Sequence, residues 1–265
     1  MPPIETWGKR FVTQPLATRT RGDTFRVLAQ SNNTEVRINS TLLTTLAAGK
    51  FYETILTAAS TIDTSQPALV AQYANGQTFD NVPSDPFMML VPPTEQFQSD
   101  YTLSTPVTNF DINYANLVVP IAAIASVGRD GQAIPSSAFT PIGSSGFAGA
   151  KIPIGVGSHH FTADAPFGVS IYGFREVESY GYFGGTSLAP LTRVASLFLA
   201  PSTITVPLNT LQTMTANVVD LQGNPLRGVR VEFAVTGINP THGFSFTDAT
   251  GRATFQFTGA LAGTD

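Results

Sequence analysis

Short runs of alternating polar and apolar residues, separated by glycine and proline, are the feature that most constrains this chain. It has 23 Gly and 19 Pro among 265 residues, and both residue types interrupt regular structure. Alternation with a period of two is typical of half-buried strands. The pattern therefore predicts an all-β fold of the sandwich or barrel type. The clearest runs are FRVLAQ, TEVRIN, VVPIAAIASV, FGVSIYGF, VRVEFAV and RATFQF.

One segment, residues 41–60 (TLLTTLAAGKFYETILTAAS), allows a second interpretation. Leu42, Leu46 and the paired alanines are compatible with a helix. Gly49 in the middle and the many threonines favour two short strands around a turn. We expect the two strands.

A frame of Pro, Val and Tyr with equal spacing occurs twice in the chain. Two upstream valines also repeat, Val27 with Val36 and Val118 with Val127. The order of these features is the same in both places, so we predict a duplicated all-β unit of about 95 residues per copy, with both copies packed as one domain. The alternative is coincidence, because these residue types are common. The two copies of the frame are Pro67, Val70 and Tyr73, and Pro166, Val169 and Tyr172.

The repeated frame is interpreted as a folding element. Proline can begin a strand, because its missing N–H need not join the ladder. The valine is expected inside, and the tyrosine, an amphipathic ring, is expected near the rim. The frame is therefore a strand signature and not a catalytic motif.

Composition excludes several classes of protein. The chain has no cysteine, which excludes disulfides, thiolate metal sites and a cysteine nucleophile. Residues 1–37 carry six basic side chains against three acids, in a chain of net charge −4; we interpret them as a solvated strand face and not as a nucleic-acid site. No run of about 18 apolar residues occurs, so no membrane insertion is predicted. The start, MPPIETWGKR, lacks a signal-peptide core, so we expect either a cytosolic protein or a piece whose export signal lies elsewhere.

Several stretches within residues 7–185 are shared, in order, with a known family. This region resembles the N-terminal domain family of IgGFc-binding proteins, which is also found in large bacterial extracellular proteins. The resemblance implies an extracellular binding or adhesion role with a protein or glycan ligand, and it supplies no residue-level site. We expect one internally duplicated domain over residues 1–190. The stretches are GDTFRVLAQSNNTEVRIN, AGKFYE, PALVAQY, DPFMMLVPPTEQF, NYANLVVP, FGVSIYGF and SYGYFGG.

Residues 196–265 carry a different signature. The stretches APSTITVPLNTLQTMTANVVDLQGNPLRGVRVEF and FTDATGRATFQFTGALAGTD resemble the bacterial Ig-like repeats of intimin and invasin type. That resemblance implies an exported protein and a rigid spacer in a surface-exposed stalk. The stretch TSLAPLTRVA, residues 186–195, is the expected linker between the two domains.

The C-terminal domain is expected to be an incomplete Ig-like β-sandwich. An Ig-like sandwich has about seven strands, and fewer are predicted here. The last predicted strand would then have an unpaired edge. Either the parent protein continues, or a neighbouring chain supplies the missing strands by β-augmentation and the chains self-assemble. The predicted strands lie near 197–206, 212–219, 229–235, 243–247 and 252–258.

No group of residues in the sequence predicts catalysis or a metal site. His159 and His160 are adjacent, and adjacent strand residues point to opposite faces, so one ion is not expected to bind both. Ser145 is not part of a nucleophile elbow. Glu176 and Glu178 have no evident partner carboxylate of the kind a glycosidase needs. We predict a non-enzymatic protein with no catalytic residue, no metal and no cofactor.

The stretch ESYGYFGG, residues 178–185, is the best candidate for ligand contact. Its aromatic residues Tyr180, Tyr182 and Phe183 lie among glycines, and tyrosine provides a large contact area at low entropy cost. We expect these residues on a rim between the two copies or near the C-terminal domain. The alternative is a tyrosine corner that packs a loop onto the sandwich.

Two functions fit these observations. In the first, the chain is an extracellular binding or adhesion module on a surface stalk. In the second, it is a structural subunit of a surface fibre or coat, assembled through strand exchange or edge pairing. A carbohydrate-active enzyme is a third class, and it lacks a recognisable acid pair.

Overall fold

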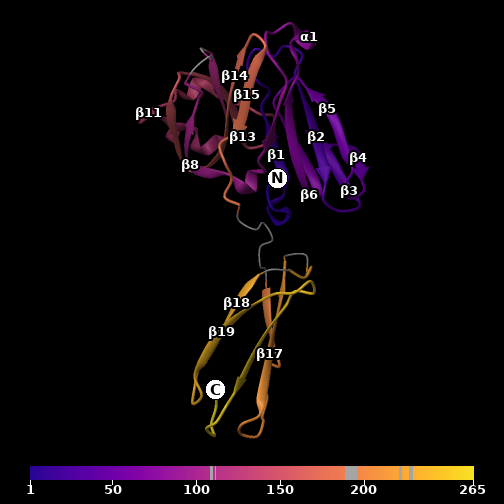
Figure 1. Cartoon of the computed structure of the whole chain (residues 1–265), viewed down its shortest axis with the longest axis vertical. Helices are drawn as coiled ribbons and strands as arrows, with labels where there is room; N and C mark the ends of the chain where they lie inside the picture. The colour runs from indigo at the N-terminus through magenta and orange to yellow at the C-terminus, as the bar shows by residue number, and fades with distance from the viewer. Residues whose placement is uncertain (108–109, 111, 189–195, 221–222, 227–228) are drawn as a thin grey trace. The chain divides into compact units, whose positions relative to one another are not determined.

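The structure, a computed structural model, describes residues 1–107, 110, 112–188, 196–220, 223–226 and 229–265. The chain forms two compact units, Met1–Leu191 and Thr192–Asp265, and strands dominate both of them (Figure 1). The predicted all-β, sandwich-like fold class is confirmed. Most of the predicted linker, residues 189–195, lies outside the described residues.

The first half of unit 1 is built on a seven-stranded sheet. Residues 41–60 form two strands, as expected, and Gly49 in the turn between them has a φ of 73°, which favours glycine. Short helical segments are the 3-10 helix Ile4–Thr6 (η1), the α-helix Gln77–Asp80 (α1) and the 3-10 helix Thr94–Gln96 (η2). The strands are β1 (Gly8–Thr13), β2 (Asp23–Ala29), β3 (Thr34–Ile38), β4 (Thr41–Leu46), β5 (Phe51–Leu56), β6 (Ser60–Ala74) and β7 (Phe87–Val91).

The second half of unit 1 is built on an eight-stranded sheet. Its 3-10 helices are Ile121–Ser126 (η3) and Ser136–Ala138 (η4). The strands are β8 (Gln98–Ser104), β9 (Asn113–Pro120), β10 (Gly128–Arg129), β11 (Gln132–Ala133), β12 (Thr140–Pro141), β13 (Phe147–Ile154), β14 (Ser158–Arg175) and β15 (Glu178–Phe183).

Strand order is the same in both halves. The first sheet runs β4-β3-β6-β2-β5, and β1 and β7 also pair with β6. The second runs β11-β10-β14-β9-β13-β12, and β8 and β15 also pair with β14. Each strand of the first half therefore has one counterpart in the second, and β12 is an addition. This is the arrangement that a duplicated unit requires.

The long central strands β6 and β14 change partners at matching irregularities. On β6 the pairing with β1 jumps from Asp63 to Ala68, and on β14 the pairing with β8 jumps from Thr162 to Phe167. Pro67 and Pro166 lie within these jumps. The expectation that the prolines begin strands was wrong, because each lies inside a long strand. The physical reason for proline is unchanged, since a bulge leaves its missing N–H outside the ladder.

Register corrects two further details of the repeat. Val70 faces Val27, whereas Val169 faces Leu117, so the counterpart of Val27 is Leu117 and not Val118. A shift of one residue moves a side chain to the opposite face of the sheet. Tyr172 is also fully buried, so the expected rim position was wrong for it.

Each half of unit 1 has its own core, and two smaller clusters join the halves. Phe11, Phe25 and Val70 belong to the first core, and Leu117 and Phe161 belong to the second. The joining clusters combine side chains from both halves, namely Leu16, Ala17, Ala74, Met89 and Tyr172 in one and Val12, Phe97, Val118 and Ile142 in the other.

Unit 2 has two small sheets around one cluster of buried residues. Its strands form the sheets β16-β17-β20 and β18-β19, and Val218, Val231 and Phe233 are part of the buried cluster. Among the described residues, β20 pairs only with β17, and Phe244 and Phe246 on β19 are exposed. The strands are β16 (Ser196–Ala200), β17 (Leu211–Val219), β18 (Arg230–Val235), β19 (Thr241–Phe246) and β20 (Arg252–Thr258).

Candidate binding surface

Each half of unit 1 has one sheet face that points away from its own core, which we call its outer face. Phe25, Val27 and Val70 point into the first core, so their neighbours along each strand point outward. The outer face of the first half consists of Phe51, Glu53, Ile55, Arg26, Leu28, Leu69, Ala71, Tyr73, Met88 and Leu90. Their counterparts in the second half, in the same order, are Gly149, Lys151, Pro153, Asn116, Val118, Gly168, Ser170, Tyr172, Gly181 and Phe183.

The outer face of the second half is covered by residues 12–17 of the first half, which we call the covering segment. Asn116 Nδ2 donates to the carbonyl oxygens of Gln14 and Pro15, both at 3.1 Å. The Tyr172 hydroxyl accepts a bond from the Ala17 N–H and donates one to Asn116 Oδ1, both at 2.7 Å. This face therefore binds an extended stretch of backbone through an amide and a phenol.

Glycines on the second outer face allow neighbouring segments to approach closely. A Cβ on Gly149 would lie 2.6 Å from Gln14 Oε1, and one on Gly168 would lie 2.7 Å from the Phe97 ring. A Cβ on Gly181 would lie 2.1 Å from the Phe87 ring. Only a small cavity of about 40 Å³ remains at this contact. The fit is as close as that of a protein core.

The first half binds the other side of the covering segment through a buried carboxyl. Asp23 Oδ2 accepts bonds from the Leu16 N–H at 2.7 Å and from Gln72 Nε2 at 2.8 Å. Its second oxygen, Oδ1, is buried with no hydrogen-bond partner among the described residues. Burial raises the pKa of Asp23 from 3.8 to about 6, although these bonds and the nearby Arg19 act in the opposite direction. The carboxyl therefore changes charge in a mildly acidic range.

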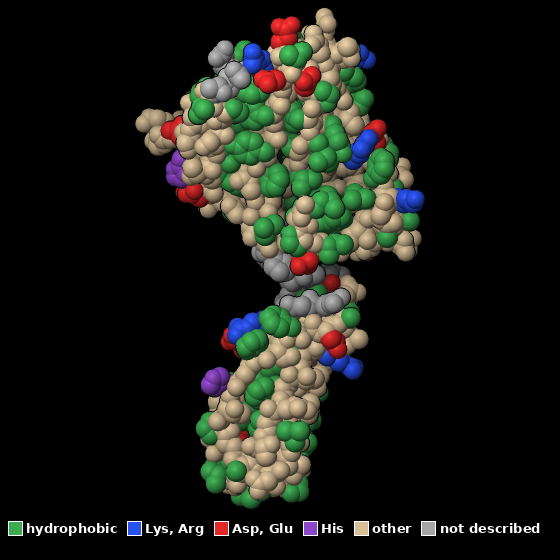
Figure 2. Space-filling view, viewed as in Figure 1, with side chains coloured by type: hydrophobic (Ala, Val, Ile, Leu, Met, Phe, Trp, Pro, Cys, Tyr) green, Lys and Arg blue, Asp and Glu red, His purple; other side chains and the backbone are tan. Residues whose placement is uncertain are grey.

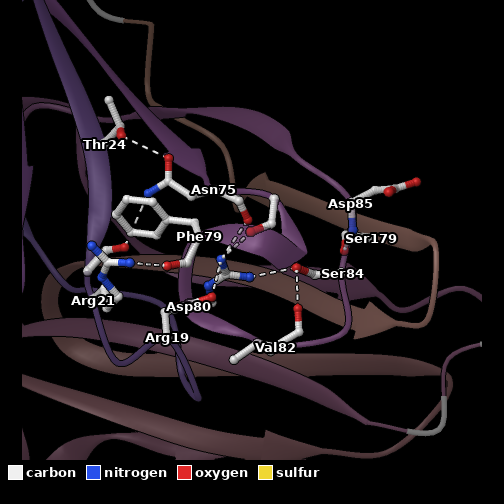
Figure 3. A network of polar contacts seen from close by, with 12 residues as sticks. Arg19, Arg21, Thr24, Asn75, Phe79, Asp80, Val82, Ser84, Asp85 and Ser179 are labelled. Carbon is white, nitrogen blue, oxygen red and sulfur yellow. Dashed lines mark hydrogen bonds and ion pairs between the residues drawn. The ribbon is translucent and has the colours of Figure 1, made fainter.

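Arg19 fixes the end of the same connection between β1 and β2 (Figure 3). Its buried guanidinium lies 2.7 Å from Asp80 Oδ1 and donates to Ser84 Oγ at 2.6 Å. It also lies 5.6 Å from the ring centre of Phe174, on β14 of the second half. A buried ion pair with further hydrogen bonds fixes geometry more than it adds stability. We assign this network a structural role.

The outer face of the first half is exposed. Phe51 and Met88 each keep 54% of their surface and Ile55 keeps 48%, and hydrophobic side chains are spread over the visible side of this unit (Figure 2). Arg26 lies among them, 2.6 Å from Glu53 Oε2. Its guanidinium carbon is 4.9 Å from the ring centre of Tyr73. The face thus combines apolar side chains, two aromatic rings and one paired cation.

A pocket of about 500 Å³ adjoins this face at the seam between the two halves. Trp7, Leu69, Leu90 and Phe183 are among its lining residues. Leu90 and Phe183 are counterparts, so the pocket lies where the ends of β7 and β15 meet. This volume is in the range of ligand pockets, at roughly 300–1,000 Å³.

Three polar side chains of the pocket lining, those of Thr6, Trp7 and Gln96, are already bonded within the chain. Thr6 Oγ1 donates to the Pro3 carbonyl oxygen, and Gln96 Nε2 donates to the Thr6 carbonyl oxygen. The indole N–H of Trp7, the single tryptophan of the chain, donates to the Pro2 carbonyl oxygen at 3.3 Å. The pocket therefore favours an apolar group.

Comparison with known families identifies the larger part of the chain. A family model described as IgGFc binding protein matches residues 1–173. The chain belongs to the IgGFc-binding protein family. This is a family of binding proteins and not of enzymes, and its members are typically secreted or extracellular. No curated protein and no solved structure gave a significant match.

Strand β15 of unit 1 points the three aromatic residues singled out from the sequence to two different faces. Tyr180 and Tyr182 pack against the core of the second half. Their hydroxyls donate to Asn113 Oδ1 and to the Ser104 carbonyl oxygen. Phe183 points to the opposite face and lines the pocket. The sequence analysis did not identify Trp7, Leu69 and Leu90. Leu69 could have been found from the repeated frame, because it directly precedes Val70 and corresponds to Gly168 before Val169.

Other groups considered for chemistry are held in ordinary surface contacts. His159 Nδ1 lies 2.8 Å from Asp130 Oδ2, and His160 Nε2 lies 3.0 Å from Asp100 Oδ1. Glu178 pairs with Arg175 at 3.1 Å. In the part of the chain that the structure describes, no three potential metal-ligating side chains lie together. No helix among these residues is long and apolar enough to cross a membrane.

Proposed function

We propose that this chain is an extracellular, non-enzymatic adhesion module that binds a protein or glycan ligand on the outer face of its first half. The observation that carries this proposal is the difference between the two outer faces. The same sheet position is covered in the second half and exposed in the first. Exposed apolar patches rimmed by polar residues are typical of interaction sites.

The composition of the exposed face supports a recognition role. Phe51, Tyr73 and Met88 are residue types that are enriched in the centres of interfaces, as is arginine. Arg26 is kept in place by Glu53 and by the rings beside it. A ligand therefore meets a preorganised surface, which lowers the entropy cost of binding.

The C-terminal unit is proposed as a spacer that holds this module away from a cell surface. Its resemblance to intimin and invasin repeats supports the proposal, together with its two small sheets around one core. On this view unit 1 binds the ligand and unit 2 acts as the spacer. Removing the aromatic side chains of β19 would then leave ligand affinity unchanged.

A binding screen with two matched variants tests the proposed function. The chain is screened against protein and glycan arrays that include immunoglobulin G Fc, and each hit is titrated with M88K, I55K and I121K. Ile121 is also an exposed apolar residue, at 46%, but it lies on η3 of the second half. We expect M88K and I55K to weaken binding more than about tenfold, with I121K unchanged. Equal affinities for all three variants would contradict the proposal.

A second candidate function is a structural subunit of a surface fibre. The exposed Phe244 and Phe246, at 57% each, and the free edge of β20 among the described residues favour it. A β-rich edge of this kind can pair with another chain. Light scattering and negative-stain imaging test it, because this function requires oligomers that dissociate when Thr254 or Gln256 on β20 is replaced by proline.

A further inference from the structure

We infer that the exposed outer face binds an extended segment of a partner polypeptide and takes one apolar side chain of that segment into the pocket beside Trp7. This inference rests on the proposed function and deepens it, because it chooses a polypeptide over a glycan. It is based on the way the second half binds a segment of its own chain at the same position of the fold.

The covered face shows how a sheet of this type holds extended chain. Asn116 and Tyr172 bond to backbone groups of the covering segment, at 2.7 to 3.1 Å. Val12 of that segment packs with Phe97 and Val118. Backbone bonds and two buried aliphatic side chains, Val12 and Leu16, together secure the segment. This combination is also how proteins recognise extended peptides.

The exposed face keeps the polar part of this arrangement with different side chains. Arg26 occupies the position of Asn116, and Tyr73 occupies that of Tyr172. The Tyr73 hydroxyl lies 3.5 Å from Arg26 Nη1, as the Tyr172 hydroxyl lies beside Asn116. A guanidinium and a phenol both donate hydrogen bonds to backbone carbonyl oxygens. Glu53 fixes the other side of the guanidinium.

The apolar part of the arrangement is larger on the exposed face. Trp7 precedes β1 as Phe97 precedes β8. Around Phe97 the covering segment leaves about 40 Å³ of space, and around Trp7 about 500 Å³ remains open. The open pocket continues the seam between the halves, because Leu90 and Phe183 line it from the two sides. The pocket therefore belongs to the contact between the two halves. At the covered face that contact is filled by the covering segment, and at the pocket it is open.

The chemistry of the pocket favours an amino-acid side chain over a sugar. Sugar hydroxyls taken into an apolar site need hydrogen-bond partners, and burying them without partners is costly. The Thr6 and Gln96 side chains at this site already bond within the chain. An aliphatic or aromatic side chain requires no such partner. Leu69 stands where the second half has Gly168, so the exposed face presents a larger apolar side chain to an incoming segment than the covered face does.

A peptide library is the probe, and Trp7 fluorescence is the direct readout. A library of random linear peptides of about ten residues is displayed and selected on the full chain. Neighbouring strands lie about 4.8 Å apart, so an extended peptide of this length can cross the sheet. Selected peptides are then titrated against wild type, L90K, Y73F and the control I121K. The same variants are titrated against a glycan array. Because Trp7 is the single tryptophan, its emission reports occupancy of this pocket.

We expect selected peptides to share one large apolar residue and to shift the Trp7 emission on binding. L90K should weaken them more than about tenfold and Y73F about threefold, with I121K unchanged. If only glycans bind, and L90K abolishes that binding, the polypeptide inference is overturned and the proposed function stands. If neither peptides nor glycans respond to L90K, the inference is overturned. The proposed function is overturned as well only if M88K and I55K also leave their affinities unchanged.

Discussion

The two outer faces of unit 1 occupy the same place in the same strand order, and they have opposite surroundings. At three matched positions the covered face has Gly149, Gly168 and Gly181, and the exposed face has Phe51, Leu69 and Met88. The glycines admit a neighbouring segment to contact distance. The large side chains leave apolar area exposed instead. One fold position thus serves internal packing in one half and remains open in the other, where we propose that a ligand binds.

The comparison also shows that the halves pack in a head-to-tail manner. The outer face of the second half rests against the side of the first half that carries Asp23, Gln72 and Met89. A head-to-tail contact between two copies uses one face of each and leaves the other face of the first free. The exposed face is therefore a direct result of how the duplicated unit stacks.

The largest expected effect concerns the titration of Asp23, which has no equivalent in the second half because its counterpart is Asn113. The folded-state pKa is about 6 and the ordinary value is 3.8, so the folded state holds the proton more tightly. Stability from this group is therefore greatest below about pH 4 and falls by about 3 kcal/mol as the pH rises to about 6.

Urea unfolding of wild type and D23N between pH 4 and 7 measures this effect. We expect the free energy of unfolding of wild type, relative to D23N, to decrease over about pH 4 to 6 and to level off above. Parallel pH profiles for the two proteins would show that Asp23 titrates normally.

The next effect comes from exchanging residues between the faces. G168L places the exposed face's residue in the covered one, where even a Cβ would lie 2.7 Å from the Phe97 ring. We expect a loss of about 2–3 kcal/mol from overpacking. The reciprocal change L69A should cost about 1 kcal/mol, because Leu69 is only half-buried. Chemical denaturation measures the free energy of unfolding of both variants. Equal losses would show that the two faces are packed equally tightly, against our interpretation.

A smaller effect is expected from the paired tyrosines of the repeated frame. Y172F leaves the Ala17 N–H without its acceptor in a buried site, which should cost about 1–2 kcal/mol. Y73F removes a hydroxyl from the exposed face and should change stability by less than about 0.5 kcal/mol. Thermal unfolding of both variants tests the contrast. A larger loss of stability in Y73F than in Y172F would contradict the assignment of the Tyr172 face as covered and the Tyr73 face as exposed.

The smallest expected effect on stability belongs to the exposed apolar side chains. M88S and F51S should shift the free energy of unfolding by less than about 0.5 kcal/mol, because each side chain is 54% exposed. The same variants should reduce the fluorescence of a bound hydrophobic dye, since they remove part of the exposed patch. A loss of several kcal/mol in M88S would instead place Met88 in a packed environment.

Local patterns in the sequence predicted most of the strands but not their bulges. The run VVPIAAIASV was expected to be a strand, but the strand ends at Pro120 and Ile121–Ser126 form a 3-10 helix. Period-two alternation is a property of each strand, so β4, β5 and the five strands of unit 2 were predictable near their observed places. The bulges around Pro67 and Pro166 depend on pairing with β1 and β8, which no local pattern contains. The same dependence explains the error of one residue at Val118, because register is set by the partner strand.

The candidate site was predictable only in part, for a related reason. Alternation along β15 already separates Tyr180 and Tyr182 from Phe183, so one strand could not present all three to one ligand. The contrast between Leu69 and Gly168 becomes visible only when the two frames are aligned by strand partners. The pocket beside Trp7 requires the meeting of β7 and β15, which are far apart in sequence.

The covering segment also links the order of synthesis to the folding of unit 1. Its bond from the Ala17 N–H to the Tyr172 hydroxyl joins residues 155 positions apart, and its bond from Asn116 to Gln14 spans 102 positions. Contacts of such high sequence separation form late, because the loop between them must close first. During translation Val12 and Leu16 therefore emerge long before the strands that bury them. The second half, in turn, completes its outer face only by taking up a segment that is synthesised before any strand of that half.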